Sequence, residues 1–458
     1  MLVLIMPATT DQPLRILHAV RAPVGGIFRH VLDLANGQAD RGHHVGIVAD
    51  SLTGGERAEA ALKEIAPRLK LGVHRLPIRR GPSPADILAW LRFMRLTRRL
   101  QPHVLHGHGA KATAFVRLKR RAKGAICVYT PHGGSLHYRP NTLKGAIHRR
   151  LERALMNSTD LFLFESVFER DTYQRTIGTP SGLVRCVFNG VTADEFDPVV
   201  RTADATDIVF VGEFRHIKGA DLMIDAVARL HSDGKPFTLT LAGDGEELEA
   251  LKAQVRKLGL AEAVRFIGHV KARYGFSKGR LLVVPSRGDS MPYVVIEAAA
   301  AGIPMVAANV GGIPEIFVSH TEALFAPNIV GAIADAIETA LEDPVAAQAR
   351  AKSLRERIFL HFSRKAMVEG VLTGYRFNFG DTECASGRII RRAQCDHRPH
   401  KAPLGLPEIR GIATQRRQRV LERLHTRCDH FPLSTRSRPR SASTDSSGFH
   451  HLKTSSIG

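Results

Sequence analysis

The sequence predicts an α/β protein with two doubly wound domains, because one pattern of strand, glycine-bearing turn, helix and strand occurs twice. The first copy begins with the apolar stretch 14–20, LRILHAV, and the second with 207–211, DIVFV. Apolar periodicity fails after Tyr375, which indicates where the folded part ends. We therefore expect domains at 1–195 and 205–361, a last helix at 362–375, and a tail at 376–458.

The composition is that of a soluble globular protein, with 44% hydrophobic and 24% charged residues in a chain of 458. No stretch approaches the roughly 20 consecutive apolar residues that a membrane-spanning helix needs. The five cysteines are scattered and odd in number, which favours a reducing compartment over a disulfide framework. These features predict a cytoplasmic protein.

The formal net charge of +21 is unevenly distributed along the chain. Residues 376–458 hold 16 basic and 7 acidic residues, a net charge of +9, and are rich in Arg, Ser, Thr and His. This composition predicts a disordered, low-complexity tail. Cys-Asp-His occurs at 395–397 and again at 428–430, but the spacing fits no zinc finger, so we expect no metal site.

Two glycine-bearing turns follow strands of the first domain. Gly25-Gly26 comes after the first strand and would let the backbone approach a diphosphate without a side chain in the way, although many such turns only reverse the chain. The strand at 126–129 ends on Thr-Pro-His132-Gly-Gly, which places a histidine at the carboxyl end of a parallel strand. His106 ends the preceding strand, and His108 lies in the Gly-His-Gly turn after it; both are weaker candidates for the same site.

The stretch 281–317, LLVVPSRGDSMPYVVIEAAAAGIPMVAANVGGIPEIF, carries the most specific pattern in the chain. A buried strand leads into a polar loop with Asp289, then a helix with Glu297 and a run of small residues, then another strand and a Gly-Gly turn. Ligands of open parallel sheets sit beyond the carboxyl ends of strands, where these loops lie. The two carboxylates, with Met291 and Pro292 between them, are suited to the vicinal hydroxyls of a ribose and a sugar.

A second polar loop, Gly212-Glu-Phe-Arg-His-Ile-Lys218-Gly, follows the first strand of the second domain. A lysine at a helix N-terminus is well placed for an anion, because its charge adds to that of the free backbone N–H groups. In an extended loop Arg215 would project to the same side as Glu213. Glu315, after the Gly-Gly turn, either lines the same pocket or caps a helix.

These motifs resemble those of glycosyltransferase family 4, retaining enzymes of the GT-B fold, in which two Rossmann-like domains face each other across a cleft. The family's usual Glu, seven residues, Glu is here Asp289 and Glu297, and Glu213 stands where the family usually has Arg. The resemblance implies that 362–375 is a closing helix that packs back on the first domain. It also implies the role of each candidate. The diphosphate would lie against Gly25, Gly26, Gly212, Arg215 and Lys218, the ribose on Glu297, the sugar on Asp289 and His132, and the base near the backbone of Val270.

The resemblance implies a hexosyltransferase that uses a nucleotide-diphosphate sugar as its donor and needs no metal or other cofactor. Basic clusters at 79–80, 98–99, 117–123 and 149–150 suit a polyprenyl-diphosphate-linked or glycan acceptor at an anionic membrane surface, in exopolysaccharide or other cell-surface synthesis. The expected location is the cytoplasm, with peripheral binding to the inner face of the plasma membrane as an option; a solvated basic surface without a partner is the alternative.

Three other classes stay open. An inactive relative would fit the departures at Asp289 and Glu213, and a sugar-nucleotide epimerase shares the architecture. A nucleic-acid-binding protein would account for the positive charge, but 6% aromatic residues is few for base stacking, and no basic motif is interleaved with aromatic residues. We therefore expect no nucleic-acid partner.

Overall fold

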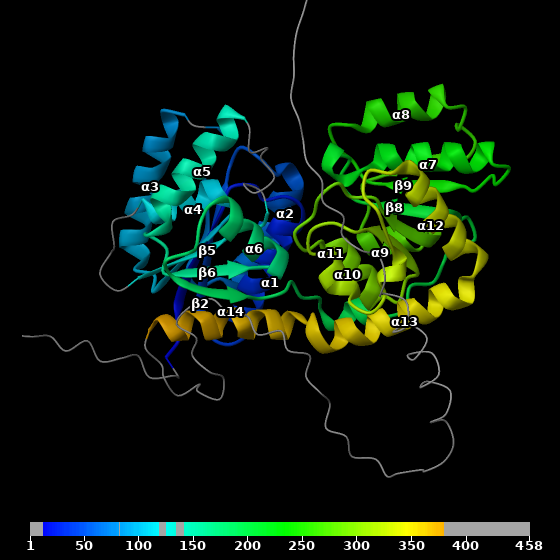
Figure 1. Cartoon of the computed structure of the whole chain (residues 1–458). Helices are drawn as coiled ribbons and strands as arrows, with labels where there is room; N and C mark the ends of the chain where they lie inside the picture. Colours follow the sequence, from blue (N-terminus) through cyan, green and yellow to red (C-terminus); the bar gives the residue numbers. More distant parts are fainter. Residues whose placement is uncertain (1–11, 82, 119–124, 134–141, 380–458) are drawn as a thin grey trace, which may run out of the picture. The chain divides into compact units, whose positions relative to one another are not determined.

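The computed structural model of the protein describes residues 12–81, 83–118, 125–133 and 142–379. Its helices and strands form two parallel sheets, one of seven strands in the order β3-β2-β1-β4-β5-β6-β7 and one of six in the order β10-β9-β8-β11-β12-β13 (Figure 1). In both sheets the strand order reverses once, between β1 and β4 and between β8 and β11. The prediction of two doubly wound domains is confirmed.

The first lobe contains the seven-stranded sheet, six helices that follow its strands, and the last described helix of the chain. Its strands are β1 (Arg15–Val20), β2 (His44–Asp50), β3 (Gly72–Leu76), β4 (Val104–His108), β5 (Ile126–Thr130), β6 (Leu161–Phe164) and β7 (Leu183–Cys186). Its helices are α1 (Gly25–Ala39), α2 (Gly55–Ile65), α3 (Ala85–Leu100), α4 (Ala110–Arg117), α5 (Leu143–Met156), α6 (Val167–Thr176) and α14 (Arg364–Asn378).

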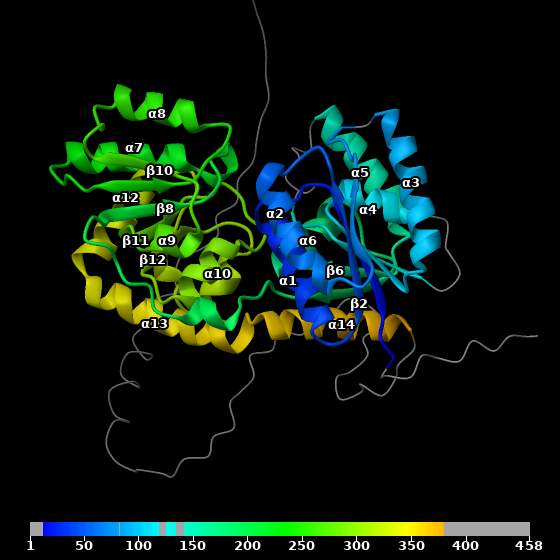
Figure 2. The same cartoon turned by 180° about the vertical axis from the view of Figure 1, so that it is seen from behind.

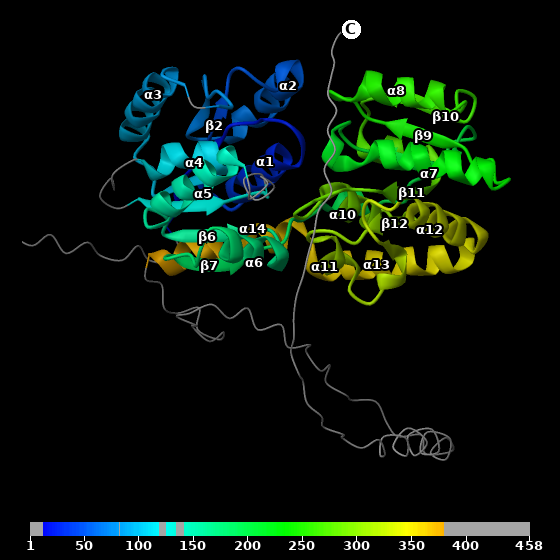
Figure 3. The same ribbon diagram turned by 45° about the horizontal axis from the view of Figure 1, so that its top comes forward.

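Helices cover both faces of the first sheet because its strands are apolar on both sides. On one face, side chains of α1, α2 and α14 pack against strand residues such as Ile16, Val128 and Ile47. On the other face α3 and α4 bury Phe93 and Phe115 against the strands, and α5 lies next to α4 (Figure 3). Helix α14 therefore returns to the first sheet from the end of the second lobe, as Figure 2 also shows.

The second lobe contains the six-stranded sheet with seven helices. Its strands are β8 (Thr206–Val211), β9 (Leu239–Ala242), β10 (Val264–Gly268), β11 (Gly279–Val284), β12 (Met305–Ala308) and β13 (Leu324–Phe325). Its helices are α7 (Ala220–Ser232), α8 (Leu248–Lys257), α9 (Ala272–Phe276), α10 (Tyr293–Ala300), α11 (Ile313–Phe317), α12 (Val330–Glu342) and α13 (Pro344–His361). Short 3₁₀ turns in the chain are η1 (Ala66–Arg68), η2 (Ala193–Phe196), η3 (His216–Lys218) and η4 (Thr321–Ala323).

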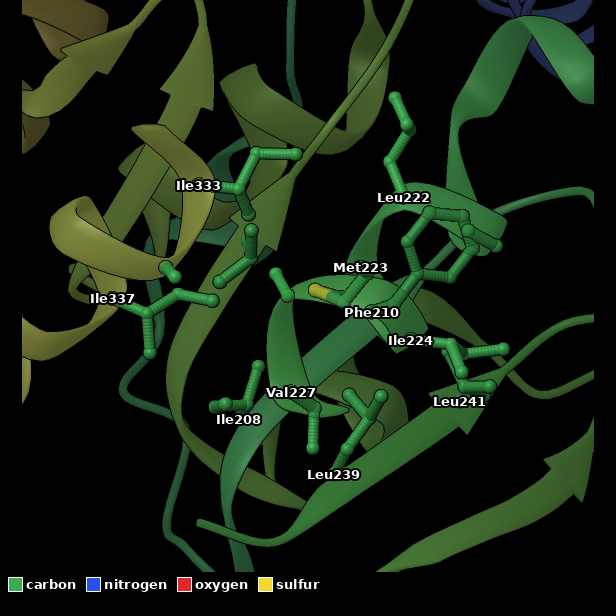
Figure 4. Close-up of a cluster of buried hydrophobic side chains, with 14 of the residues drawn as sticks. Ile208, Phe210, Leu222, Met223, Ile224, Val227, Leu239, Leu241, Ile333 and Ile337 are labelled. Atoms are coloured by element: carbon green, nitrogen blue, oxygen red, sulfur yellow. The ribbon is translucent and has the colours of Figure 1, made fainter. Parts of the chain in front are cut away.

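The core of the second lobe has one layer on each side of its sheet. On one side Met223 and Val227 of α7 and Ile333 and Ile337 of α12 pack on the strands, and α8 joins them (Figure 4). On the other side α9, α10, α11 and α13 form the second layer. The small residues Ala298–Ala301 let α10 lie close to the strands beneath it.

Arg117 makes the most deeply buried ion pair that joins two helices of the first lobe. Its Nη1 atom lies 2.6 Å from Oε2 of Glu152 on α5, and the guanidinium lies 4.0 Å from the ring centroid of Tyr129. Both charged side chains are almost fully buried. The sequence predicts that Arg117, in the basic cluster 117–123, suits an anionic partner, and this part of the prediction is wrong, since its charge is neutralised inside the lobe. The remainder of that cluster, 119–123, lies outside the described residues.

Some element bounds differ from the sequence prediction. The strand expected at 126–129 continues to Thr130, and the strand expected at 207–211 begins at Thr206. Helix α14 continues past Tyr375 to Asn378. The predicted tail from residue 380 on, with both Cys-Asp-His triplets, lies outside the described residues. Within the described part, no helix is both long and apolar enough to cross a bilayer.

Candidate active site

Lys218 and Asp289 meet at the point where the strand order of the second sheet reverses. Lys218 ends η3, the turn that follows β8, and Asp289 lies in the loop that follows β11. The Lys218 Nζ atom donates to Oδ1 of Asp289 over 2.7 Å. The other carboxylate oxygen, Oδ2, and the neighbouring Ser290 hydroxyl are buried and have no hydrogen-bond partner among the described residues. Such groups are ready to bond a polar ligand.

Two glycines allow neighbouring loops to approach the loop after β11 closely. Gly219 has a φ of 72°, and a Cβ atom there would lie 2.1 Å from the carbonyl oxygen of Pro285. Gly311 has a φ of 60°, and a Cβ atom there would lie 1.5 Å from the carbonyl oxygen of Asp289. A side chain at Gly219 would push η3 away from Pro285 and the loop after β11, and one at Gly311 would push the loop after β12 away from Asp289.

Arg287 fastens the same two loops from the other side. Its guanidinium donates to both carboxylate oxygens of Asp221, at the start of α7, over 2.7 and 2.5 Å, and to the carbonyl of His216. The hydrogen bonds that Arg287 donates to Asp221 raise the pKa of Arg287. The paired acid and base hold η3 against the loop after β11, which fixes the position of Lys218.

The remaining donor-site candidates of the second lobe follow β8, β10 and β11. Gly212 follows β8, and the extended loop after it buries Phe214 while Glu213 and Arg215 are exposed. The Arg215 Nη1 atom is 3.6 Å from Oε2 of Glu213. Met291 and Pro292 are buried at the start of α10, and Val270 is half-buried after β10. Their roles with a ligand stay predictions.

Glu297 does not stand alone on α10. Its Oε1 atom pairs with Nη1 of Arg29, a residue of α1 in the first lobe. The same guanidinium donates to both carboxylate oxygens of Glu195 over 2.7 and 2.8 Å and lies 4.4 Å from the ring centroid of Tyr293. Burial opposes the charge of Arg29, but Glu195 and Asp33 outweigh it and raise the pKa of Arg29. The binding of a ribose by Glu297 stays a prediction. The ribose hydroxyls would have to compete with Arg29 for the carboxylate of Glu297.

The predicted Gly25-Gly26 turn forms the N-terminus of α1. Gly25 has a φ of 60° and open space around it, whereas a Cβ on Gly26 would lie 3.4 Å from the ring of Tyr293. The turn therefore lies beside the N-terminal end of α10, the helix that carries Glu297. Its free backbone N–H groups are consistent with the predicted approach to a diphosphate.

His132 belongs to a cluster of five buried or half-buried histidines in the first lobe. In the register of β1 and β4, His18 lies opposite His106, and His108 lies one same-face position further on. His132 follows β5, which pairs with β4, and His30 of α1 lies over it with ring centroids 4.9 Å apart. The period of two along adjacent strands places the strand histidines on one face of the sheet.

Both ring nitrogens of His132 contact other protein groups. Nδ1 lies 2.8 Å from Oε1 of Glu165, and Nε2 lies 2.9 Å from Nδ1 of His108. The backbone of His132 has a φ of 56°, uncommon for a residue other than glycine, and the next N–H, that of Gly133, donates to Glu169. The predicted contact of His132 with a sugar therefore cannot use a free ring nitrogen without a rearrangement.

Two carboxylates after β6 enclose this turn. Burial of Glu165 works against its charge, but His132 and His30 outweigh it, and the pKa of Glu165 is lowered. Burial and then Glu165 itself raise the pKa of Glu169 to about 7. At neutral pH the charge of the pair is thus carried mainly by Glu165, next to His132.

The histidine cluster connects to the loop after β11 through Asn189 and Tyr293. The Oδ1 atom of Asn189 lies 2.8 Å from Nδ1 of His30, and its Nδ2 group donates to the carbonyl of Met291 over 2.9 Å. The hydroxyl of Tyr293 is 3.4 Å from the same His30 nitrogen. One polar network therefore includes candidate residues from both lobes.

The sequence left open whether Glu315 lines the pocket or caps a helix, and the structure shows a helix cap. Its two carboxylate oxygens accept the backbone N–H groups of Val167 and Phe168 over 2.9 and 2.7 Å, at the N-terminus of α6. This is a helix cap, made by a residue of the second lobe on a helix of the first. Glu315 therefore joins the two lobes.

The fold and the placement of these residues together define the class of protein. The sequence profile of the family described as Glycosyltransferase Family 4 matches residues 24–195, and that of Glycosyl transferases group 1 matches residues 192–358. The chain is a glycosyltransferase of the GT-B type. Within that type, it belongs to glycosyltransferase family 4.

Individual relatives agree with this assignment. Glycogen synthase of Mycobacterium tuberculosis is 28% identical over 377 residues, which cover 77% of this chain and 91% of the relative. An alpha-D-kanosaminyltransferase of Streptomyces kanamyceticus is 26% identical over 64% of this chain and 83% of its own. An O-antigen biosynthesis glycosyltransferase of Escherichia coli is 26% identical over half of this chain and 65% of its own.

Solved structures show the same fold. Sucrose-phosphate synthase from Thermosynechococcus elongatus superposes with a TM-score of 0.67 at 22% identity, covering 80% of this chain and all of the other. The Anabaena protein HepE in complex with UDP-glucose superposes with a TM-score of 0.64 at 18% identity, covering 79% of this chain and 98% of the other.

The buried histidines predict that the protein loses stability in acid. Burial lowers the pKa of His18 and that of His30 from 6.5 to about 4, so the unfolded chain binds more protons between these values. Their stabilising contribution is present above pH 6.5 and is lost as the pH falls through 4, about 3 kcal/mol for each residue. The raised pKa of Glu169 acts in the opposite direction, since its contribution is lost as the pH rises towards 7.

Urea unfolding at pH values between 7.5 and 4 measures this effect. The free energy of unfolding should fall steadily below pH 6.5, and replacing His18 by Asn should make the fall shallower. A free energy of unfolding that stays constant from pH 7 to pH 4.5 would show that these rings are not buried in neutral form.

Proposed function

We propose that the protein is a retaining glycosyltransferase that moves a sugar from a nucleotide-diphosphate sugar to a glycan or polyprenyl-linked acceptor in cell-surface or exopolysaccharide synthesis. The observation that carries the proposal is the contact of Lys218 with Asp289 at the switch point of the second sheet, beside two buried polar atoms without partners. A solved structure of the same fold is described in complex with UDP-glucose, which supports the class of donor.

The reaction needs stabilisation of the charge that develops on the leaving diphosphate. Lys218 and Arg215 supply positive charge, and the N-termini of α7 and α1 supply backbone N–H groups. On donor binding, Lys218 would exchange part of its contact with Asp289 for a phosphate oxygen. Asp289 would then hold the sugar hydroxyls through the freed oxygen and Oδ2. We propose that these cations serve in place of a metal ion.

Bond making and breaking then follow from the positions of the two substrates. The acceptor hydroxyl forms a bond to the anomeric carbon on the face from which the diphosphate leaves, and its proton passes to the departing phosphate oxygen. No side chain is assigned as a nucleophile in this proposal. The contribution of the protein is to orient the substrates and to exclude water.

The acceptor is assigned to the first lobe. A cavity of about 410 Å³ lies at the carboxyl ends of β2 and β3, lined by Asp50, Leu52, Thr53, Ile78, Arg79, Arg80, Gly81 and Ser83. The carboxylate of Asp50 is hydrogen-bonded within the protein, since it accepts the N–H groups of Leu52 and Ile78. Arg79 and Arg80 therefore leave the cavity positively charged, which suits a phosphate-bearing acceptor.

The experiment is incubation of the purified chain with a panel of nucleotide sugars and a lipid-linked or glycan acceptor, with detection of the released nucleoside diphosphate. The proposal expects release from one donor and an α- or β-linkage that keeps the configuration of the donor. Conversion of the nucleotide sugar without release would indicate an epimerase. An absence of release with every donor, from protein that binds none of them, would contradict the proposal.

We also propose a cytoplasmic enzyme that binds the inner membrane surface through α3 and α5. Leu143, Ile147 and Leu151 form an exposed stripe at helical spacing on α5, and Ile87, Leu88 and Leu91 are exposed on α3. Arg92, Arg95, Arg98 and Arg99 are exposed on the following turns of α3. Apolar side chains beside cations are typical of helices that bind an anionic bilayer interface.

Sedimentation with liposomes that contain anionic lipid tests the membrane surface. Changing both Arg98 and Arg99 to Glu should reduce binding at least about tenfold, because each cation contributes about 1 kcal/mol near such a surface. The same change at Arg256 and Lys257 of α8, in the other lobe, should leave binding unchanged. An absence of liposome binding by the unmodified protein at low salt would contradict the proposal.

A further inference from the structure

Four contacts link three histidines in a row to a glutamine at one end and a carboxylate at the other. Oε1 of Gln38 lies 2.8 Å from Nε2 of His18, and Nδ1 of His18 lies 2.9 Å from Nε2 of His108. Nδ1 of His108 lies 2.9 Å from Nε2 of His132, whose Nδ1 lies 2.8 Å from Glu165. Each distance is that of a hydrogen bond.

Counting protons along this row constrains its charge. Each of the four contacts needs one hydrogen, because a carbonyl or carboxylate oxygen only accepts and two bare ring nitrogens repel each other. Three neutral imidazoles carry only three hydrogens. With Gln38 oriented as in the structure, the row therefore holds one further proton, placed on a ring or on Glu165.

The surroundings favour His132 as the holder of that proton. His18 and His108 are fully buried, and burial lowers the pKa of both, to about 4 for His18 and well below 6.5 for His108. Glu165 keeps its charge. Burial raises the pKa of Glu165, but His132 outweighs this effect, and the pKa of Glu165 is lowered. Of the three rings in the row, His132 alone contacts a carboxylate, since its Nδ1 atom lies 2.8 Å from Oε1 of Glu165.

A metal ion is the other arrangement that could gather these rings, and the geometry is against it. His30, His108 and His132 could share an ion, as could His18, His106 and His108. Imidazoles on a tetrahedral zinc ion lie about 3.4 Å apart at their nitrogens, longer than the 2.9 Å found here. His106 also uses both nitrogens elsewhere, on Tyr375 and on Thr130.

We propose that Glu165 is a positioning residue for the sugar-transfer site, which holds His132 as a fixed imidazolium at the carboxyl end of β5. The proposal rests on the function proposed above and adds a residue that the sequence did not indicate. Three side chains face His132 directly: His108 of β4, His30 of α1 and Glu165. A fourth, Glu169 of α6, accepts the backbone N–H of Gly133, the residue after His132. Through His30 the imidazolium connects to Tyr293 and the loop after β11.

The role follows from the direction of the ring. Because both nitrogens of His132 point into the protein, it acts on a substrate through its charge and its C–H edge, while Glu165 holds the ring and the left-handed turn in place. Replacing Glu165 by Gln leaves the row satisfied, since the amide N–H can donate to Nδ1 and three neutral rings then suffice. The variant is therefore expected to fold, with His132 neutral.

Ring-¹⁵N histidine NMR on the full chain tests the proton without any need for activity, with the His132 signals assigned from His132→Gln. At pH 8 the unmodified protein should show both ring nitrogens of His132 in protonated form, and Glu165→Gln should show one protonated and one bare nitrogen. Glu169→Gln, a buried carboxylate of the same turn, should keep the imidazolium. A neutral His132 in the unmodified protein, an unchanged ring in Glu165→Gln, or one bound zinc per chain by elemental analysis would each overturn the proposal.

Kinetics with the donor found above provide the second readout. Glu165→Gln should lower kcat/KM about tenfold or more and introduce a further loss of activity as the pH rises, whereas Glu169→Gln should show no such loss. If the NMR result holds while no donor is turned over, the function proposed above fails and the assignment of the proton stands. A pH profile of Glu165→Gln parallel to that of the unmodified protein would exclude the positioning role.

Discussion

Replacing Lys218 by Ala should reduce the release of nucleoside diphosphate about 10²- to 10³-fold, because the ammonium group faces the charge that develops on the leaving phosphate. Its Nζ atom is 2.7 Å from Asp289, and it lies beside the switch point of the second sheet. The change should lower kcat/KM and weaken the binding of the diphosphate product. Steady-state kinetics with the preferred donor measure both.

Lys235→Ala is the matched control for this variant. Lys235 is in the same lobe and also pairs with an acid, since its Nζ atom lies 3.0 Å from Oε1 of Glu342, but it lies after α7 at the opposite end from Lys218. Its removal should leave turnover within about twofold of the unmodified protein. Equal activities of the Lys218 and Lys235 variants would contradict the assignment of Lys218 to the diphosphate.

Replacing Glu152 by Ala should destabilise the protein by about 3–5 kcal/mol, because it leaves the buried charge of Arg117 without a partner. The carboxylate accepts from Arg117 over 2.6 Å and from the hydroxyl of Tyr129 over 3.0 Å. It also raises the pKa of Arg117, against the effect of burial, so the guanidinium stays charged at any pH of interest. Chemical denaturation at pH 7.5 measures the loss.

Two further variants separate the buried charge from the general loss of packing. Arg117→Met combined with Glu152→Leu removes both charges and should recover most of the stability. Glu249→Ala breaks an exposed pair, Glu249 with Lys252, and should leave the midpoint of unfolding almost unchanged. If Glu152→Ala were no more costly than Glu249→Ala, the pair would not be buried as described.

The sequence predicts the candidate site of the second lobe better than that of the first. Strand, polar loop and small-residue helix follow each other closely there, so Lys218 and Asp289 could be placed at two carboxyl ends before their contact was known. The structure adds why they meet, since Gly219 lets η3 lie against Pro285 directly after β11, an approach that no side chain would allow. The period of two in Leu-His-Gly-His also contained the signal that His106 and His108 share a face.

The partners of the candidate residues could not be predicted, because they come from distant parts of the sequence. Glu165 reaches His132 only through the pairing of β5 with β6, and Arg29 reaches Glu297 from another lobe. Nothing local marks a carboxylate after an apolar strand as the partner of a histidine 33 positions earlier. The prediction for Arg117 was wrong for the same reason, because a run of basic residues does not indicate that a buried acid on the next helix will pair with one of them.

Calorimetric titration of UDP, GDP and ADP into the full chain tests most directly the claim that the second lobe holds a nucleotide-diphosphate donor. One of the three nucleotides should bind with one site per chain, and Lys218→Ala should weaken that binding at least about tenfold, whereas Lys235→Ala should not. Binding of none of the nucleotides, or equal binding by the Lys218→Ala variant, would contradict the account.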